Sequence, residues 1–112
     1  MADHIKLNPA SGNYVVQAGD TRLGVTALAV ELREGGHGPV IYVPRTDIDM
    51  AMLTRTDRTT TCPSKGVASY YSVRTPAGTL HNAVWSYEAP KPGLEAISGH
   101  LAFYPSVAVT PT

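Results

Sequence analysis

The stretch that decides the fold is VASYYSVRT-PAG-TLHNAVWSYE, which runs from Val67 to Glu88. Both outer runs are rich in β-branched and aromatic residues, which favour strands. Between them, Pro76-Ala77-Gly78 offers a three-residue loop whose glycine can take the left-handed conformation. The pattern therefore predicts a β-hairpin with strands over Val67–Thr75 and Thr79–Glu88.

The three-residue loop also predicts the register of this hairpin. If Thr75 pairs with Thr79, then Tyr71 lies opposite Ala83 and Ser69 lies opposite Trp85. Successive side chains of a strand point to opposite faces, so these residues share one face. We expect that face to be strongly aromatic.

Short β-rich runs separated by glycine and proline turns lie on both sides of the hairpin. About seven or eight strands with one or two short helical turns predict a mainly β fold, a single small antiparallel β domain built as a barrel or sandwich. Besides the hairpin, the expected strands are 14–16, 22–33, 40–43, 101–104 and 107–109, and the expected helical turns are 47–53 and 94–97.

Composition excludes several classes of protein. A chain of 112 residues with 43% hydrophobic residues is typical of one domain, covering residues 1–112. Nine basic and nine acidic side chains cancel without clustering, so we expect neither nucleic acid nor a membrane as partner. A single cysteine and the absence of an apolar signal-like start predict a soluble, cytoplasmic protein.

Chemistry is concentrated in Thr59-Thr60-Thr61-Cys62-Pro63-Ser64-Lys65-Gly66, which enters the first hairpin strand. A thiolate is the reactive form of cysteine, and a nearby cation such as Lys65 favours it, so Cys62 is a candidate nucleophile. Lys65 and Arg45 are candidate ligands for an anionic group. The alternatives are a small buried thiol at Cys62 and a solvated ammonium at Lys65.

His100 is a candidate base, because a histidine beside Cys62 would make a Cys–His pair of the kind used in nucleophilic catalysis. The four histidines are too far apart in sequence to fix two ligands on one element, so we expect no metal and no cofactor. Tyr70, Trp85 and Tyr87 could form the wall of a ligand pocket. Core packing is the alternative for these aromatic side chains.

Four ordered motifs carry a resemblance to a known family: Tyr42-x-Pro44-Arg45-x-Asp47, Thr61-Cys62-Pro63-x-Lys65-Gly66-x-Ala68-x-Tyr70, Asn82-Ala83-x-Trp85-x-Tyr87 and Gly99-His100-x-Ala102-Phe103-Tyr104. Together they resemble the bacterial and fungal family catalogued as domain of unknown function 427, from about Val40 to Val109. The resemblance implies a β-tent-like domain. Relatives with that fold commonly hold zinc through two cysteine pairs, which a chain with one cysteine cannot supply.

Two hypotheses of different classes follow. In the first, the domain binds a small anionic or polar molecule in a pocket around Cys62 and Lys65, with possible catalysis by Cys62. In the second, the same motifs only set turns and packing, and the chain is a non-enzymatic module that associates with itself as a homodimer. A nucleotidyltransferase-like activity is a further alternative, although the paired acids and phosphate turn that it needs are missing from the sequence.

Overall fold

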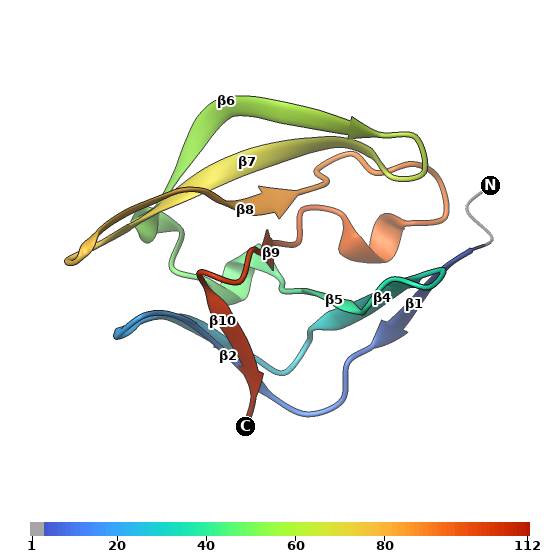
Figure 1. Cartoon of the computed structure of the whole chain (residues 1–112). Helices are drawn as coiled ribbons and strands as arrows, with labels where there is room; N and C mark the ends of the chain where they lie inside the picture. The colour runs from blue at the N-terminus through green and yellow to red at the C-terminus, as the bar shows by residue number, and fades with distance from the viewer. Residues whose placement is uncertain (1–3) are drawn as a thin grey trace.

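The computed structural model describes residues 4–112, which form ten strands and three short 3-10 turns (Figure 1). The strands are β1 (Ile5–Pro9), β2 (Tyr14–Ala18), β3 (Thr21–Thr26), β4 (Val30–Glu34), β5 (Val40–Tyr42), β6 (Leu53–Cys62), β7 (Gly66–Thr75), β8 (Gly78–Ser86), β9 (Ala102–Phe103) and β10 (Ala108–Pro111). The 3-10 turns are η1 (Arg45–Asp47), η2 (Met50–Met52) and η3 (Glu95–Ile97). All pairings between strands are antiparallel, so the predicted fold class is confirmed.

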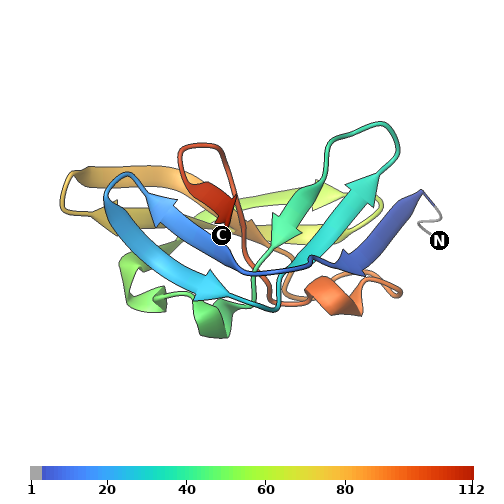
Figure 2. The same cartoon turned by 90° about the horizontal axis from the view of Figure 1, so that it is seen from below.

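The strands form two layers. A four-stranded sheet of order β6-β7-β8-β9 makes the upper layer in Figure 1, and two three-stranded sheets, β1-β4-β5 and β10-β2-β3, make the lower one. Seen from below, β10 lies between the β2–β3 hairpin and the β4–β5 hairpin (Figure 2). Each lower sheet packs its own apolar cluster against the upper sheet, one around Val16 and Leu23 and the other around Leu32 and Tyr42.

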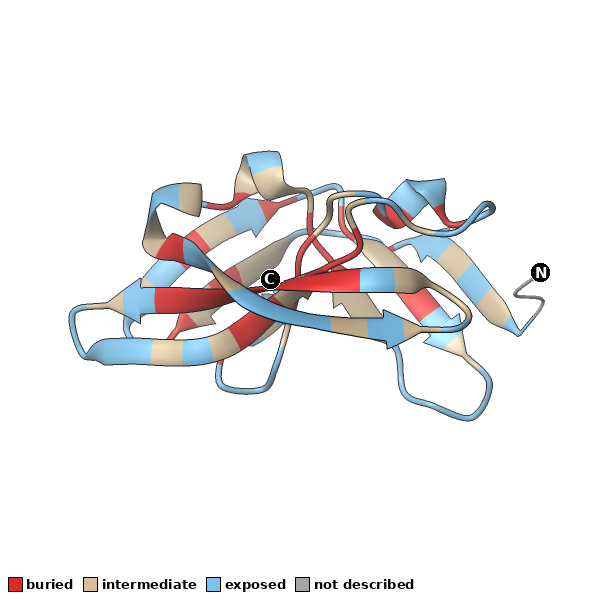
Figure 3. Cartoon of the chain, turned by 90° about the horizontal axis from the view of Figure 1, so that it is seen from above, coloured by how far each residue is buried: buried red, intermediate tan, exposed pale blue. Residues whose placement is uncertain are grey.

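β7 is the central strand of both clusters. Every residue from Ala68 to Val73 is buried, as the red segment of β7 in Figure 3 shows. Tyr71 and Val73 belong to one cluster, and Ala68 and Tyr70 belong to the other. A single strand therefore supplies apolar side chains to both halves of the domain.

The predicted hairpin exists, but its predicted register is wrong. Thr75 pairs with Gly78 instead of Thr79, and after an irregularity at Ser72 the pairs are Tyr71 with Val84 and Tyr70 with Trp85. Asn82, inside the bulged part of β8, has a φ of 49°, a conformation that asparagine tolerates better than most residues. The bulge displaces Trp85 from the expected partner Ser69 and places it beside Tyr70.

A second bulge, in β6 between Arg55 and Thr59, lies next to the first. The Thr56 hydroxyl donates to Oδ1 of Asn82 over 2.6 Å, and the backbone N–H of Asn82 donates to the Ser72 hydroxyl over 3.1 Å. These two hydrogen bonds therefore connect the irregular segments of β6 and β8 to each other and to β7. Bulges bend strands and increase their twist, which lets the long strands β6 to β8 reach over both lower sheets.

Other differences from the sequence-based elements are local. The run 22–33 is not one strand but two, β3 and β4, which belong to different sheets. The predicted turns over 47–53 and 94–97 appear as η2 and η3, and a further turn, η1, comes just before η2. β1 and β6 were not predicted as strands. Residues 4–112 contain no helix with the length and apolar character that a membrane crossing requires.

Candidate functional site

A pocket of about 350 Å³ lies between the β4–β5 hairpin of the lower layer and strands β7 and β8 of the upper layer. We call it the aromatic pocket, because five of its lining residues are Tyr42, Tyr70, Trp85, Tyr87 and Tyr104. The rest of its lining is Leu32, Glu34, His37, Gly38, Val40 and Lys65. Four of the residues proposed from sequence as ligand-binding therefore share one pocket: Lys65, Tyr70, Trp85 and Tyr87.

An ion pair occupies the polar end of the aromatic pocket. Lys65 lies in the tight turn between β6 and β7, and its Nζ is 2.6 Å from Oε1 of Glu34, at the end of β4. The lysine side chain is only 12% exposed. The hydrogen bond from Lys65 is the main reason that the pKa of Glu34 lies below its ordinary value, helped by the lysine charge and by His4. The carboxylate thus stays ionised, and it neutralises Lys65.

Cys62 lies next to this ion pair. Its Sγ is 3.6 Å from the Nζ of Lys65, and its side chain is half-buried against the cluster that contains Tyr42 and Tyr87. The expected proximity of thiol and cation is therefore present. Because Glu34 already neutralises Lys65, the thiol faces an ion pair and not a free cation.

The aromatic wall is held together by ring contacts and hydrogen bonds. The rings of Trp85 and Tyr104 are tilted at 54° with centroids 4.8 Å apart, and Trp85 meets Tyr42 edge-on. The indole Nε1–H donates to the Tyr42 hydroxyl over 3.3 Å. Burial raises the pKa of Tyr42 to about 12, and it raises the pKa of Tyr87 as well, so both phenols stay neutral.

Tyr70 has a different environment. Its hydroxyl is 2.9 Å from the Thr60 hydroxyl, and the Arg58 guanidinium lies over its ring, 4.9 Å from the centroid. Burial acts to raise the pKa of Tyr70, but hydrogen bonds to Thr60 and Tyr104 and the charge of Arg58 outweigh it, so the pKa is lowered. Tyr104 is the partner of Tyr70 in one of these hydrogen bonds, and the same bond raises the pKa of Tyr104. Tyr70 is thus the phenol of this pair with the more acidic hydroxyl.

Arg45 lies in another cluster, on the opposite face of β7 and β8. Its guanidinium contacts Tyr71 and Ser86, whereas the pocket is lined by Tyr70 and Trp85, the alternate residues of the same strands. Arg45 Nε donates to the carbonyl of Gly99 over 2.7 Å. Arg45 and Lys65, both proposed as ligands for an anion, are therefore not brought together.

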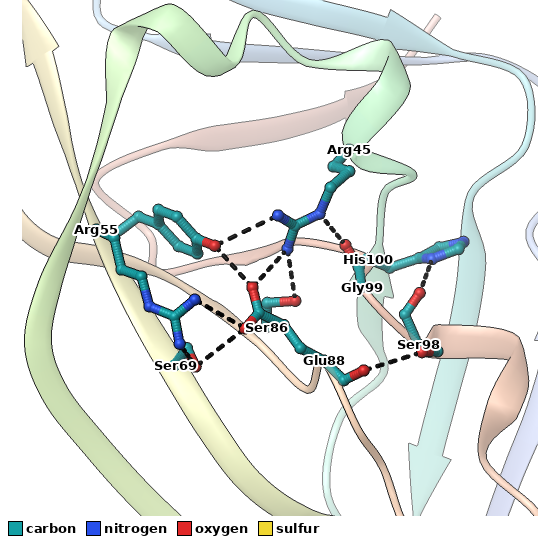
Figure 4. Close-up of polar contacts among 9 residues, drawn as sticks. Arg45, Arg55, Ser69, Ser86, Glu88, Ser98, Gly99 and His100 are labelled. Atoms are coloured by element: carbon teal, nitrogen blue, oxygen red, sulfur yellow. Dashed lines mark hydrogen bonds and ion pairs between the residues drawn. The ribbon is translucent and has the colours of Figure 1, made fainter.

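The centre of this second cluster is Glu88, as Figure 4 shows. Its carboxylate accepts hydrogen bonds from Tyr71 at 2.8 Å, from Arg45 at 3.1 Å and from Arg55 at 3.0 Å, and a longer one from Ser69 at 3.4 Å. Partial burial acts to raise the pKa of Glu88, but the Tyr71 bond and the two arginine charges outweigh it and lower the pKa. The Glu88 cluster ties η1, β6, β7 and the end of β8 to one another.

His100 borders the Glu88 cluster. Its Nδ1 is 3.1 Å from the carbonyl of Ser98, and its neighbour Gly99 binds Arg45 (Figure 4). The contact found for the Cys62 thiol is with Lys65 instead. The structure therefore places the two members of the expected Cys–His pair in different clusters.

Possible metal ligands are not grouped in the part of the chain that the structure describes. Within residues 4–112, no three histidine, cysteine, aspartate or glutamate side chains gather closely enough to hold a metal ion.

The sequence was compared with those of known protein families, and one family matches. The family whose profile matches residues 6–110 is described as Domain of unknown function (DUF427). The chain belongs to this family. The match extends well before Val40, so the first two strands of the domain, β1 and β2, are part of the DUF427 unit as well. Curated proteins give no match to the chain.

Two residues that matter for the aromatic pocket of this DUF427 domain, Glu34 and Tyr42, were not proposed as site residues from sequence. Glu34 is separated from Lys65 by 31 positions, and Tyr42 comes from the short strand β5, far from the hairpin. Tyr42 does stand in a family-like motif, which is the signal that could have found it. Glu34, at the end of a strand beside two glycines, carries no such signal.

Proposed function

We propose that the aromatic pocket binds a small planar molecule with one polar or singly anionic edge. The observation that carries this proposal is the combination of five aromatic side chains with a half-buried lysine–carboxylate pair in one hollow. Ligand sites are commonly pockets of about 300–1,000 Å³ with mostly apolar walls and a few fixed polar groups. The aromatic pocket has this composition and lies near the lower end of that range.

The polar end limits the charge of the ligand. Lys65 has three donors, of which Glu34 accepts one and Cys62 faces another. Within residues 4–112 the third donor has no partner, and it would serve a carboxylate or carbonyl oxygen of a ligand. Since the ion pair is already neutral, the site favours a neutral or singly charged edge over a dianion such as a phosphate monoester.

Thermal denaturation with benzoate and nicotinate as probes tests the proposal. A ligand at about ten times its Kd stabilises the native state by about 1.4 kcal/mol, which is a rise in Tm of about 5 °C for a chain of this size. Tyr104→Ala removes an exposed aromatic ring from the lining of the pocket, and Lys65→Met removes the donor. Both changes should abolish the rise, whereas the control Lys6→Ala, at an exposed position of β1, should keep it.

If neither probe raises Tm at any concentration tested, the proposal fails for planar carboxylates. If all three variants keep the full rise, the ligand binds elsewhere, and the assignment of the pocket is wrong.

A second candidate function is covalent chemistry at Cys62, supported by its 3.6 Å contact with Lys65 at the polar end of the pocket. Alkylation by iodoacetamide near neutral pH tests it. A thiol activated by Lys65 should react faster in the wild type than in Lys65→Met, because a nearby cation favours the reactive thiolate. Equal rates in the two proteins would mean an inert thiol. The cytoplasmic location expected from sequence is consistent with a thiol that stays reduced.

A further inference from the structure

A second hollow adjoins the aromatic pocket. It has a volume of about 250 Å³ and is lined by Pro39, Val40, Ile41, Trp85, Phe103, Pro105, Val107 and Val109. Val40 and Trp85 line both hollows. We call the second one the apolar groove. It lies where β5 and β10, which belong to different lower sheets, meet the upper sheet at β8 and β9.

The two hollows differ in chemistry. All eight lining side chains of the apolar groove are uncharged and apolar except for the indole N–H of Trp85, and that group already donates to Tyr42. The aromatic pocket contains the ion pair of Lys65 and Glu34. It therefore combines charged groups with aromatic rings, whereas the lining of the apolar groove is uncharged.

We infer that the ligand of this protein is amphipathic: a planar polar head in the aromatic pocket carries an apolar arm that passes Trp85 and lies in the apolar groove. The inference rests on the proposed function, which places the head. Val40 and Trp85 stand in the walls of both hollows, and this shared wall is what assigns the groove to the arm of the same molecule. An aliphatic or aryl substituent displaces water that the groove walls cannot hydrogen-bond, which favours binding.

A series of para-alkyl benzoates tests the inference, from benzoate through 4-ethylbenzoate to 4-butylbenzoate. Trp85 is the only tryptophan, so its fluorescence reports binding at the boundary of the two hollows. Full burial of a methylene is worth about 0.8 kcal/mol, or about fourfold in Kd. Because the groove is partly open, we expect 4-butylbenzoate to bind at least ten times more tightly than benzoate, about 1.4 kcal/mol.

Groove variants locate the effect of the arm. Val109→Ser and Ile41→Thr each make one half-buried wall residue more polar, and both should reduce the gain from the butyl group at least threefold while leaving the Kd of benzoate unchanged. Val25→Ser is the matched control, at an exposed valine of β3, and should change neither Kd. Using two groove variants protects the test against one of them failing to fold.

The outcomes separate the two proposals. Equal Kd values for benzoate and 4-butylbenzoate would overturn the inference and leave the head site intact. A gain from the butyl group that persists in both groove variants would also overturn it, because the arm would lie elsewhere. If no benzoate binds, the proposed function fails together with the inference. If sedimentation shows a homodimer that Val109→Ser dissociates, the groove is an interface between copies, and the inference is again overturned.

Discussion

The Glu88 cluster offers a sharp test of how the domain is held together. Replacing Glu88 with glutamine keeps the shape of the side chain but removes its charge and one of its two acceptor oxygens. Oε2 accepts from Tyr71 and Arg45, and Oε1 accepts from Arg55 and Ser69. Whichever way the new amide turns, its NH₂ group faces an arginine donor.

The expected loss follows from these contacts. Charge-assisted hydrogen bonds of buried groups are worth about 1.5–3 kcal/mol each. Glu88 is 32% exposed and Arg45 34% exposed, so solvent screening brings each bond closer to about 1 kcal/mol. Two bonds are lost outright and two are weakened, which gives a loss of roughly 2–3 kcal/mol in the free energy of unfolding, or about 8–12 °C in Tm.

Urea denaturation near neutral pH and at about pH 4 measures this loss. Because the pKa of Glu88 is lowered in the native state, the carboxylate stabilises the fold fully above its unfolded pKa of about 4.3, and that contribution fades as the pH falls through the native pKa. Glu31→Gln is the control, since it removes one surface ion pair with Arg33, which is 57% exposed. We expect the control to cost less than about 1 kcal/mol.

Two results would refute this reasoning. A Glu88→Gln loss no larger than that of Glu31→Gln would show that the cluster contributes little. A loss of the same size at both pH values would show that the ionised carboxylate is not its source.

Three further predictions concern the scaffold. Gly24→Ala should lower the free energy of unfolding by at least about 3 kcal/mol, because a Cβ there would lie 2.0 Å from the carbonyl oxygen of Asp47. Gly36 has open space around it, so Gly36→Ala should change the free energy of unfolding by less than about 1 kcal/mol. Thermal denaturation compares the two variants. Asn82→Val should be less stable than Asn82→Gly by about 1–2 kcal/mol in urea denaturation. Both variants lose the hydrogen bond with Thr56, but only valine is strained at a φ of 49°. Equal stabilities of the two variants would contradict this explanation. Burial of the neutral Tyr42 phenol stabilises the native state fully below about pH 10, and this contribution is lost as the pH rises toward the native pKa of about 12. Tyr42→Phe should therefore make the free energy of unfolding fall less steeply above pH 10. If the free energy falls as steeply in the variant as in the wild type, Tyr42 does not cause the fall.

Sequence patterns predicted the parts of the fold whose signals are local. The hairpin around Pro76, the strand 40–43 and the turn at 94–97 depend on strand-forming runs and turn residues close together in the chain, and each is present. β6 escaped prediction because LTRTDRTTTC is polar on both faces, as expected for an edge strand whose residues are mostly exposed. The hairpin register was wrong because its two-residue loop and its bulge at Asn82 depend on packing against β6 and β7.

The candidate site was predictable to a similar extent. Lys65, Tyr70, Trp85 and Tyr87 lie in or beside the hairpin, so local structure brings them to the same part of the sheet, but Tyr70 and Trp85 are partners only because of the bulge. Whether Arg45 joins them depends on which face of β7 and β8 it meets, and this is set by the path of the chain through η1. The Glu34 that neutralises Lys65 comes from another sheet, and no spacing in the sequence indicates it.

Ligand binding in the aromatic pocket is tested most directly by a ¹H–¹⁵N correlation spectrum of the protein titrated with benzoate. The side-chain Nε1–H of Trp85 gives the only indole signal, and it lies in the wall of the aromatic pocket. If benzoate binds there, this signal and the backbone amides of Lys65 and Gly38 shift together with one Kd. Shifts confined to residues around Arg45 and Glu88, on the opposite face of β7 and β8, or no shifts at all, would contradict it.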